Sequence, residues 1–231
     1  MIRKNKMITD IMIIDALRYM GMPIAKADEE LKEKIRETFH FLVGISLNKY
    51  VYKRLSVTIP NGSEKGVFFD NAAVFVPSKD LAHLLMHVNS CYIIAATLGA
   101  EVDRQISLMQ RVDMMKAVML DACASVLIDR VCDDIEMEIA SQLDEGLYLT
   151  MRYSPGYGDV SLELSASLLK WLQASKTIGL SLTQSNMLIP TKSVTALIGI
   201  STQMENRQKS CADCNLVKTC TYRKGGKRCG L

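Results

Sequence analysis

The spacing of apolar residues changes its period several times along the chain. Between residues 28 and 48, apolar residues recur three or four positions apart, which is the spacing of one face of an α-helix. These residues are Leu31, Ile35, Phe39, Leu42 and Ile45. From residue 50 the pattern alternates, and Leu55, Val57 and Ile59 are separated by polar residues. That alternation is typical of a half-buried strand, so a helix followed by a strand is predicted.

The same two periods, together with turn residues, predict the other elements. Helices are expected over residues 8–21, 79–88, 99–143 and 162–172, the third of them being one long helical region. Strands are expected over residues 91–97, 178–182 and 194–200, and one or two more over residues 67–75. Helices and strands are mixed without a regular βαβ rhythm. The pattern therefore favours an α+β fold, with a largely antiparallel sheet packed with helices.

One segment, Arg152-Tyr153-Ser154-Pro155-Gly156-Tyr157-Gly158-Asp159, cannot continue a helix. Pro155 lacks an amide donor and fixes its own φ, while the two glycines permit backbone conformations that other residues resist. Such a sequence serves to turn sharply or to bring bare amide groups against a ligand. The guanidinium of Arg152 offers a fork suited to a carboxylate. These residues leave two interpretations open, a surface turn and a ligand-binding loop.

Composition excludes several classes of protein. The 231 residues are 48% hydrophobic, which suffices for a sizeable core, and 14 methionines against 6% aromatic residues make that core aliphatic. The net charge of +3 is too small to indicate a nucleic-acid or anionic-membrane partner. No secretory signal is recognised, and no apolar stretch reaches the roughly 18 to 20 residues of a membrane span. A cytoplasmic protein is the expectation.

The composition changes around residue 201, which predicts a globular body over residues 1–201 and a small tail over residues 202–231. The tail reads Cys211-x2-Cys214-x5-Cys220-x8-Cys229, with basic residues between the cysteines. A segment too short to build a core can be ordered by a metal, and four thiolates complete a tetrahedral shell. The spacing suits zinc or an iron–sulfur cluster equally. The alternative is a disordered basic tail with unligated thiols.

A series of polar residues follows one face of the long predicted helix. Asp121, Ser125, Asp129 and Asp133 are four positions apart. A solvated face accounts best for Asp129 and Asp133. Asp121 lies inside an apolar run, so it is predicted to face a pocket and to pair there with a cationic ligand group.

Signatures of side-chain catalysis are scarce in this sequence. His40, His83 and His87 form no recognisable ligand set with the cysteines, and Cys123 and Cys132 look like small apolar helix residues. The sequence contains no GxSxG motif, no phosphate-binding P-loop, and no GxGxxG placed after a strand. The body is therefore predicted to bind a ligand rather than to carry out acid–base chemistry.

At Arg152-x-x-Pro155-Gly156-Tyr157 the chain resembles the activation domain of cobalamin-dependent methionine synthase, which binds S-adenosylmethionine through an Arg-x-x-Pro-Gly-Tyr turn. Residues 182–187 (Leu-Thr-Gln-Ser-Asn-Met), followed by Pro190, are similar to the family's Leu-Thr-Glu-Ser segment and its downstream proline. Ala96-Thr97-Leu98-Gly99 is similar to a segment of the stand-alone members. Those members occur beside a shortened methionine synthase and often end in a cysteine cluster. The resemblance spans residues 92–200 and the tail.

The resemblance implies a stand-alone reactivation partner that binds S-adenosylmethionine and supports reductive methylation of the corrinoid on a methionine synthase. It implies cobalamin on that partner and a flavodoxin or ferredoxin-type electron donor. Arg152 would grip the methionyl carboxylate, and Asp121 would face the ammonium or sulfonium side. The remaining implied contacts come from the turn itself, at Ser154, Pro155, Gly156 and Tyr157. The other hypothesis is a metal or iron–sulfur tail protein that acts as a redox or partner-binding module without S-adenosylmethionine.

The chain departs from the family pattern at three places. The family's Ala-Cys-Pro after the tyrosine is replaced by Gly158-Asp159-Val160. The acidic residue expected shortly before the arginine is displaced to Asp144 or Glu145, and a late tyrosine of the family falls at Ile198.

Overall fold

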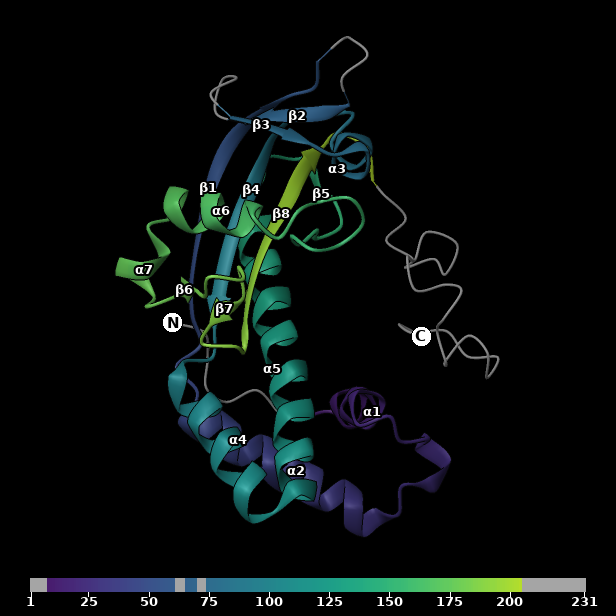
Figure 1. The fold of residues 1–231 in the computed structure, drawn as a ribbon. Helices are drawn as coiled ribbons and strands as arrows, with labels where there is room; N and C mark the ends of the chain where they lie inside the picture. The colour runs from purple at the N-terminus through teal and green to yellow at the C-terminus, as the bar shows by residue number, and fades with distance from the viewer. Residues whose placement is uncertain (1–7, 61–64, 70–73, 205–231) are drawn as a thin grey trace. The chain divides into compact units, whose positions relative to one another are not determined.

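The structure is a computed structural model that describes residues 8–60, 65–69 and 74–204 (Figure 1). Its helices are α1 (Asp10–Tyr19), the 3₁₀ turn η1 (Ile24–Lys26), α2 (Glu29–Ile45), α3 (Lys79–Leu84), α4 (Ala100–Val112), α5 (Met114–Ala140), α6 (Leu164–Trp171) and α7 (Ala174–Thr177). Its strands are β1 (Lys49–Thr58), β2 (Gly66–Phe69), β3 (Val74–Pro77), β4 (Val88–Thr97), β5 (Tyr148–Leu149), β6 (Ser181–Leu182), β7 (Leu188–Ile189) and β8 (Ser193–Ser201). The predicted α+β fold class is confirmed.

Six strands form one sheet in the order β3-β2-β1-β4-β8-β5, and β6 pairs with β7 in a separate two-stranded sheet. The β1–β2, β2–β3 and β5–β8 pairs are antiparallel. In the β1–β2 pair, Val57 lies opposite Phe69, and both side chains are buried. The alternation that predicted β1 therefore reflects one face of the strand turned toward the core.

The chain divides into two compact units. The first unit comprises residues 1–53, 93–142 and 165–195, and the second comprises residues 54–92, 143–164 and 196–231. The division falls inside β1, β4 and β8, so each of these strands carries residues of both units. The predicted boundary between a body and a tail at residue 201 stays a prediction, because residues 205–231 lie outside the described residues.

The first unit is built around α5, which packs against α1, α2 and α4 (Figure 1). The face of α2 predicted from the sequence is the buried one, since Ile35, Phe39 and Leu42 have no exposed surface. Asp28 begins this helix by accepting a hydrogen bond from the Leu31 N–H at 2.8 Å. On α5, Leu120 and Ile135 are also buried. Within the described residues, no helix is long and apolar enough to cross a membrane.

The long helical region predicted over residues 99–143 is divided into α4 and the longer α5, because the chain breaks at Asp113. This residue has an extended backbone (φ −151°, ψ 96°), and its carboxylate accepts a hydrogen bond from the Lys116 N–H at 3.1 Å. Aspartate is among the best residues for beginning a helix, so it ends α4 and begins α5 at one position. Apolar residues keep helical spacing on both sides of Asp113, so the sequence pattern did not reveal the break.

The strand predicted over residues 178–182 is largely wrong. Gln173 and Gly179 adopt left-handed backbone conformations, with φ of 50° and 74°, and the short helix α7 lies between them. Only Ser181 and Leu182 form a strand, and they pair with β7. Ile178 and Leu180 lie in the connection between α7 and β6, and both are buried there. Their apolar pattern therefore reflects burial in a loop rather than a strand.

Candidate ligand-binding turn

The segment singled out in the sequence, residues 152–159, lies in the second unit and begins from backbone fastened to β8. The Tyr153 N–H donates to the Leu197 carbonyl at 2.9 Å, and the Leu197 N–H donates to the Tyr153 carbonyl at 2.8 Å. Two residues before Arg152, the Thr150 N–H donates to the Gly199 carbonyl at 2.9 Å, and the Gly199 N–H donates to Thr150 Oγ1 at 2.8 Å. Arg152 is therefore flanked on both sides by backbone fixed to a strand.

The turn closes on itself through its own amides. The Tyr157 N–H donates to the Ser154 carbonyl at 3.2 Å, and the Val160 N–H donates to the Tyr157 carbonyl at 3.0 Å. The Gly156 N–H donates to the Val160 carbonyl at 2.9 Å. Because the Gly156 and Tyr157 amides are already bonded, they are not the bare amides that the sequence suggested. A ligand at the turn would instead meet its carbonyl oxygens and side chains.

The turn lies at the surface with its aromatic tip outward. The Tyr157 side chain is 68% exposed, whereas Pro155 is buried and Arg152 and Ser154 are half-buried. Gly156 has φ +90°, and a Cβ there would lie 2.8 Å from a methyl carbon of Leu162. The left-handed backbone conformation therefore favours glycine at this position, and a larger residue would also have to displace the exposed Leu162 side chain.

The far end of the turn is fastened to α3 by Asp159. Its carboxylate accepts hydrogen bonds from the Ser78 hydroxyl, from the Lys79 N–H at 2.7 Å and from the Asp80 N–H at 3.4 Å. Ser78 is also the N-cap of α3, because its Oγ accepts from the Leu81 N–H at 2.9 Å. Asp159 thus satisfies amide groups that the first turn of a helix leaves without partners.

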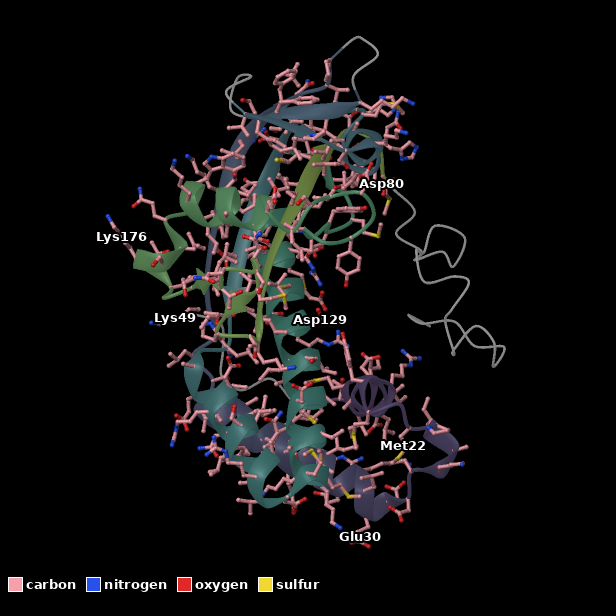
Figure 2. All side chains as sticks on the ribbon, viewed as in Figure 1. Met22, Glu30, Lys49, Asp80, Asp129 and Lys176 are labelled. Atoms are coloured by element: carbon pink, nitrogen blue, oxygen red, sulfur yellow. The ribbon has the colours of Figure 1, made fainter. Side chains whose placement is uncertain are left out.

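Asp80 reciprocates by reaching back from α3 to the turn. Its Oδ2 accepts from the Asp159 N–H at 3.2 Å and from the Tyr153 hydroxyl at 3.3 Å. Asp80 is labelled at the start of α3 in Figure 2. Gly158, at φ +55°, passes so close that a Cβ there would overlap both Asp80 Oδ2 and the Tyr153 hydroxyl. We call these five residues (Ser78, Asp80, Tyr153, Gly158 and Asp159) the Asp80–Asp159 clasp.

Sequence reasoning missed this clasp. It identified the Ser78-Lys79-Asp80 helix start and the Gly158-Asp159 departure from the family pattern, but nothing connected them. The bonded side chains of Ser78 and Asp159 are 81 residues apart. The sequence showed only that Asp159 ends a glycine-rich turn. Many surface turns carry an aspartate without such a role.

Hydrogen bonding controls the charge states within the clasp. Burial alone would raise the pKa of the Asp159 carboxyl, but the bonds from Ser78, Lys79 and Asp80 outweigh it and lower that pKa. Burial, together with the Asp80 carboxylate and its hydrogen bond, raises the pKa of Tyr153 to about 12. At neutral pH Asp159 is therefore an anionic acceptor and Tyr153 a neutral donor.

A dependence of stability on pH follows from the lowered pKa of Asp159. The stabilisation is present above the unfolded-state pKa of roughly 4 and is lost as pH falls through the lower folded-state pKa. Because Asp159 is exposed and solvent screens its charge, we expect wild type to exceed Asp159→Asn in free energy of unfolding by no more than about 1 kcal/mol at neutral pH, and by less near pH 3. Urea unfolding of both proteins at the two pH values measures this difference. A difference that is unchanged at low pH would contradict it.

Asp121 lies in the first unit, on α5, and the prediction that it faces a pocket is corrected. Its side chain is 55% exposed and pairs with Lys192 Nζ at 2.8 Å. Lys192 also donates to Ser125 Oγ at 2.9 Å. The Asp121 carboxylate therefore has a cationic partner within its own chain. Asp129, predicted to be solvated, accepts from the Tyr19 hydroxyl at 2.9 Å and is half-buried.

The two weaker segments of the family resemblance both lie in the first unit. Residues 183–187 form the turn between β6 and β7, and the Ile189–Pro190 peptide bond after them is cis. The Ser193 hydroxyl donates to Thr97 Oγ1 at 2.7 Å, and the Leu98 N–H donates to the Lys192 carbonyl at 3.0 Å. Residues 96–99 are therefore hydrogen-bonded to Lys192 and Ser193, which follow Pro190.

A shallow hollow of about 360 Å³ also lies in the first unit, among α6, α7 and β6. Its lining comprises Ala166, Leu169, Lys170, Gln173, Ser175, Lys176, Leu180, Ser181 and Leu182. None of the predicted ligand-binding residues contributes to it, so it does not bear on the proposed site.

The predicted metal ligands Cys211, Cys214, Cys220 and Cys229 lie outside the described residues. Within the part of the chain that is described, no group of three or more His, Cys, Asp or Glu residues could hold a metal ion. Burial raises the pKa of Cys91 and of Cys123 to about 12, so these two thiols stay protonated. Cys123 and Cys132 are fully buried on α5, as predicted for small apolar helix residues.

Comparison with known proteins agrees with this architecture. Residues 89–213, more than half of the chain, match the family model described as "Vitamin B12 dependent methionine synthase, activation domain". The solved structure "Crystal Structure of the MetH Reactivation Domain bound to AdoHcy" is similar, with a TM-score of 0.60 and 14% identity, over 93% of this chain and 83% of that chain. At that identity, the similarity shows a shared fold. No curated protein matched the sequence.

Proposed function

Since this chain belongs to the family of vitamin B12-dependent methionine synthase activation domains, we propose that it binds S-adenosylmethionine at residues 152–159 and supports reductive methylation of a partner's corrinoid. The observation that carries the proposal is the Arg152–Tyr157 turn, which lies inside the matched residues and is fastened at both ends. The ligand in the similar solved structure, AdoHcy, is the demethylated form of the proposed ligand.

The residues of the turn divide the recognition of the ligand among them. The Arg152 guanidinium would bind the methionyl carboxylate through two parallel N–H···O bonds. The Ser154 hydroxyl, the Gly156 carbonyl and the outward Tyr157 ring would contact the rest of the ligand, while Pro155 is buried and holds the shape of the bend. Asp121, the remaining contact expected from the sequence, stays a prediction, because its carboxylate is paired with Lys192 within the first unit.

The chemical demand on this chain is positioning. The corrinoid on the partner supplies the nucleophile when it is bound, so no residue here needs to act as one. This is consistent with a turn that offers the Arg152 cation, hydroxyl groups and backbone carbonyls, and with buried, protonated thiols at Cys91 and Cys123. Holding the methyl donor in the orientation for transfer is the contribution expected from such a site.

The affinity of the turn is tested by replacing its arginine. Arg152→Ala should weaken S-adenosylmethionine binding about ten- to a hundredfold, because a charge-assisted bidentate contact contributes roughly 1.5 to 3 kcal/mol. Arg152→Lys should lose part of that affinity, since it keeps the charge but not the fork. Isothermal titration of the purified full chain measures both.

Arg104→Ala is the matched control. Arg104 pairs with Glu101 on α4, with Nη2 to Oε1 at 2.7 Å, and its side chain is 68% exposed. Its removal should leave the affinity for S-adenosylmethionine unchanged. Equal binding by wild type and Arg152→Ala would overturn the assignment of the site.

The proposed partner is a cobalamin-binding methionine synthase that is a separate chain, with a flavodoxin or ferredoxin-type protein as electron donor. Family membership implies a corrinoid-binding protein, and the separate-chain arrangement and the donor are our inference. Co-purification of the full chain with a cobalamin-loaded methionine synthase tests the arrangement. Failure to associate at micromolar concentration, with or without S-adenosylmethionine, would contradict it.

The tail supports a second, compatible proposal, in which Cys211, Cys214, Cys220 and Cys229 bind zinc or an iron–sulfur cluster. The sequence spacing motivates it, because these thiols are close enough in the chain to share one metal. Anaerobic purification followed by visible spectroscopy and metal analysis distinguishes a coloured cluster from colourless stoichiometric zinc. Metal-free protein would leave the tail without this role.

A further inference from the structure

We infer that the Asp80–Asp159 clasp is a positioning device, which holds the ligand-binding turn in one conformation before S-adenosylmethionine arrives. The inference rests on the proposed function, because it assigns the clasp to the same turn. Asp80 and Asp159 are then positioning residues, which act on the ligand through the conformation of residues 154–157 rather than by touching it.

The clasp closes the end of the turn that β8 does not hold. At its head, the turn is held by the paired Tyr153 and Leu197 backbone groups. Beyond Tyr153, the backbone hydrogen bonds from the Gly156, Tyr157 and Val160 amides join the turn to itself. Asp159 provides the second attachment, to the α3 backbone at Lys79 and Asp80. A segment held at both ends has far fewer conformations than one held at its head.

The contacts of the clasp are reciprocal. Asp159 accepts from α3 backbone amides, while Asp80 on α3 accepts from the Asp159 amide and the Tyr153 hydroxyl. Each carboxylate therefore fixes the backbone that carries the other. Tyr153, one residue after Arg152, links the clasp directly to the start of the turn. Capping of α3 alone would need the Asp159 carboxylate. It would not need the hydrogen bonds that Asp80 accepts from the Asp159 N–H and the Tyr153 hydroxyl.

Gly158 leaves no space for a side chain within the clasp. The Asp80 carboxylate and the Tyr153 hydroxyl occupy the position that a Cβ at residue 158 would take. The backbone of the turn thus passes between two polar groups of its own unit at close contact. An arrangement of this kind tolerates few alternative conformations, which is the property that a preorganised binding loop needs.

The clasp should control the affinity for S-adenosylmethionine by setting the fraction of molecules in which the turn has its binding conformation. Apparent affinity falls in proportion to that population, so a turn that is competent about 2 to 20% of the time binds about five- to fiftyfold more weakly. We expect a loss of that size for Asp159→Ala. Asp159→Asn, which keeps an acceptor oxygen, should lose less, and Tyr153→Phe, which removes one donor to Asp80, should lose about two- to fivefold.

The experiment combines titration of the full chain with S-adenosylmethionine and amide hydrogen exchange of the same proteins. Without ligand, Asp159→Ala should exchange faster than wild type at the Tyr157 and Val160 amides, whose bonds close the turn. Saturating S-adenosylmethionine should restore slow exchange there, because binding selects the ordered turn. The matched control is Asp28→Ala, which removes the carboxylate cap of α2 and should change neither the affinity nor exchange in the turn.

The possible results separate this inference from the proposed function. If wild type binds no S-adenosylmethionine, the proposed function is wrong, and this role of the clasp falls with it. If wild type binds and the folded Asp159→Ala and Tyr153→Phe variants bind equally well, only the inference is overturned. Weaker binding with unchanged exchange in the turn would also overturn it, because the effect would then not act through preorganisation. If Asp159→Ala does not fold, Tyr153→Phe decides the outcome alone.

Discussion

Gly158→Ala is expected to destabilise the protein by about 2 to 4 kcal/mol. The residue has φ +55°, a left-handed conformation that costs an L-residue roughly 1 to 2 kcal/mol. The added Cβ would also displace Asp80 Oδ2 or the Tyr153 hydroxyl, and each bond lost there costs about 1 kcal/mol. The free energy of unfolding from urea titration, monitored by tyrosine fluorescence and circular dichroism, measures the effect.

Gly146→Ala is the control that separates backbone conformation from crowding. Gly146 has φ +83°, and nothing lies within 4 Å of the position of its Cβ. Its replacement should therefore cost only the conformational part, about 1 to 2 kcal/mol. Equal losses at the two glycines would mean that the close approach of Asp80 and Tyr153 to the turn contributes nothing to stability.

Phe39→Ala is expected to cost about 3 to 5 kcal/mol, the usual range for removing a buried phenylalanine. The side chain is fully buried in α2, within the core of the first unit that includes Leu42. Its loss combines the transfer free energy of the ring with a cavity that a closely packed interior fills only in part. Thermal and urea unfolding of the purified variant provide the measurement.

Phe41→Ala offers the same substitution two positions along the same helix. The Phe41 side chain is 43% exposed, so its truncation should cost no more than about 1 kcal/mol. The difference between the two losses in free energy of unfolding shows which face of α2 is buried. If Phe41→Ala were the more damaging, the assignment of the buried face of α2 would be wrong.

Local pattern was sufficient to predict elements with an unbroken period and an evident start. The α2 helix has both, since Asp28 caps it and its apolar residues keep helical spacing through Leu42. Local pattern failed where a cap lies within a continuous apolar face. Asp113 ends one helix and begins the next, and only the packing of α4 against α5 shows why the chain folds back there.

The candidate site divides in the same way. Proline and two glycines predicted the bend at residues 152–159, because their backbone restrictions act within a few residues. The bonding of Asp159 to Ser78 could not be predicted, because hydrogen-bond partners 81 residues apart leave no periodic signal. The expected pocket at Asp121 was mistaken for a similar reason, since nothing local marked Lys192 as its partner.

Short-range chemistry written in the chain therefore determined the class of fold, most helices and strands, the bend at Arg152 and the family to which the chain belongs. Tertiary structure alone decided which amides of that bend are already bonded, which carboxylates are paired within the chain, and that α3 and the bend hold one another through Asp80 and Asp159. The physical reason is range. Backbone torsions and apolar periods act over a few residues, whereas the partner of a charged or hydrogen-bonding group is set by where folding brings distant segments together.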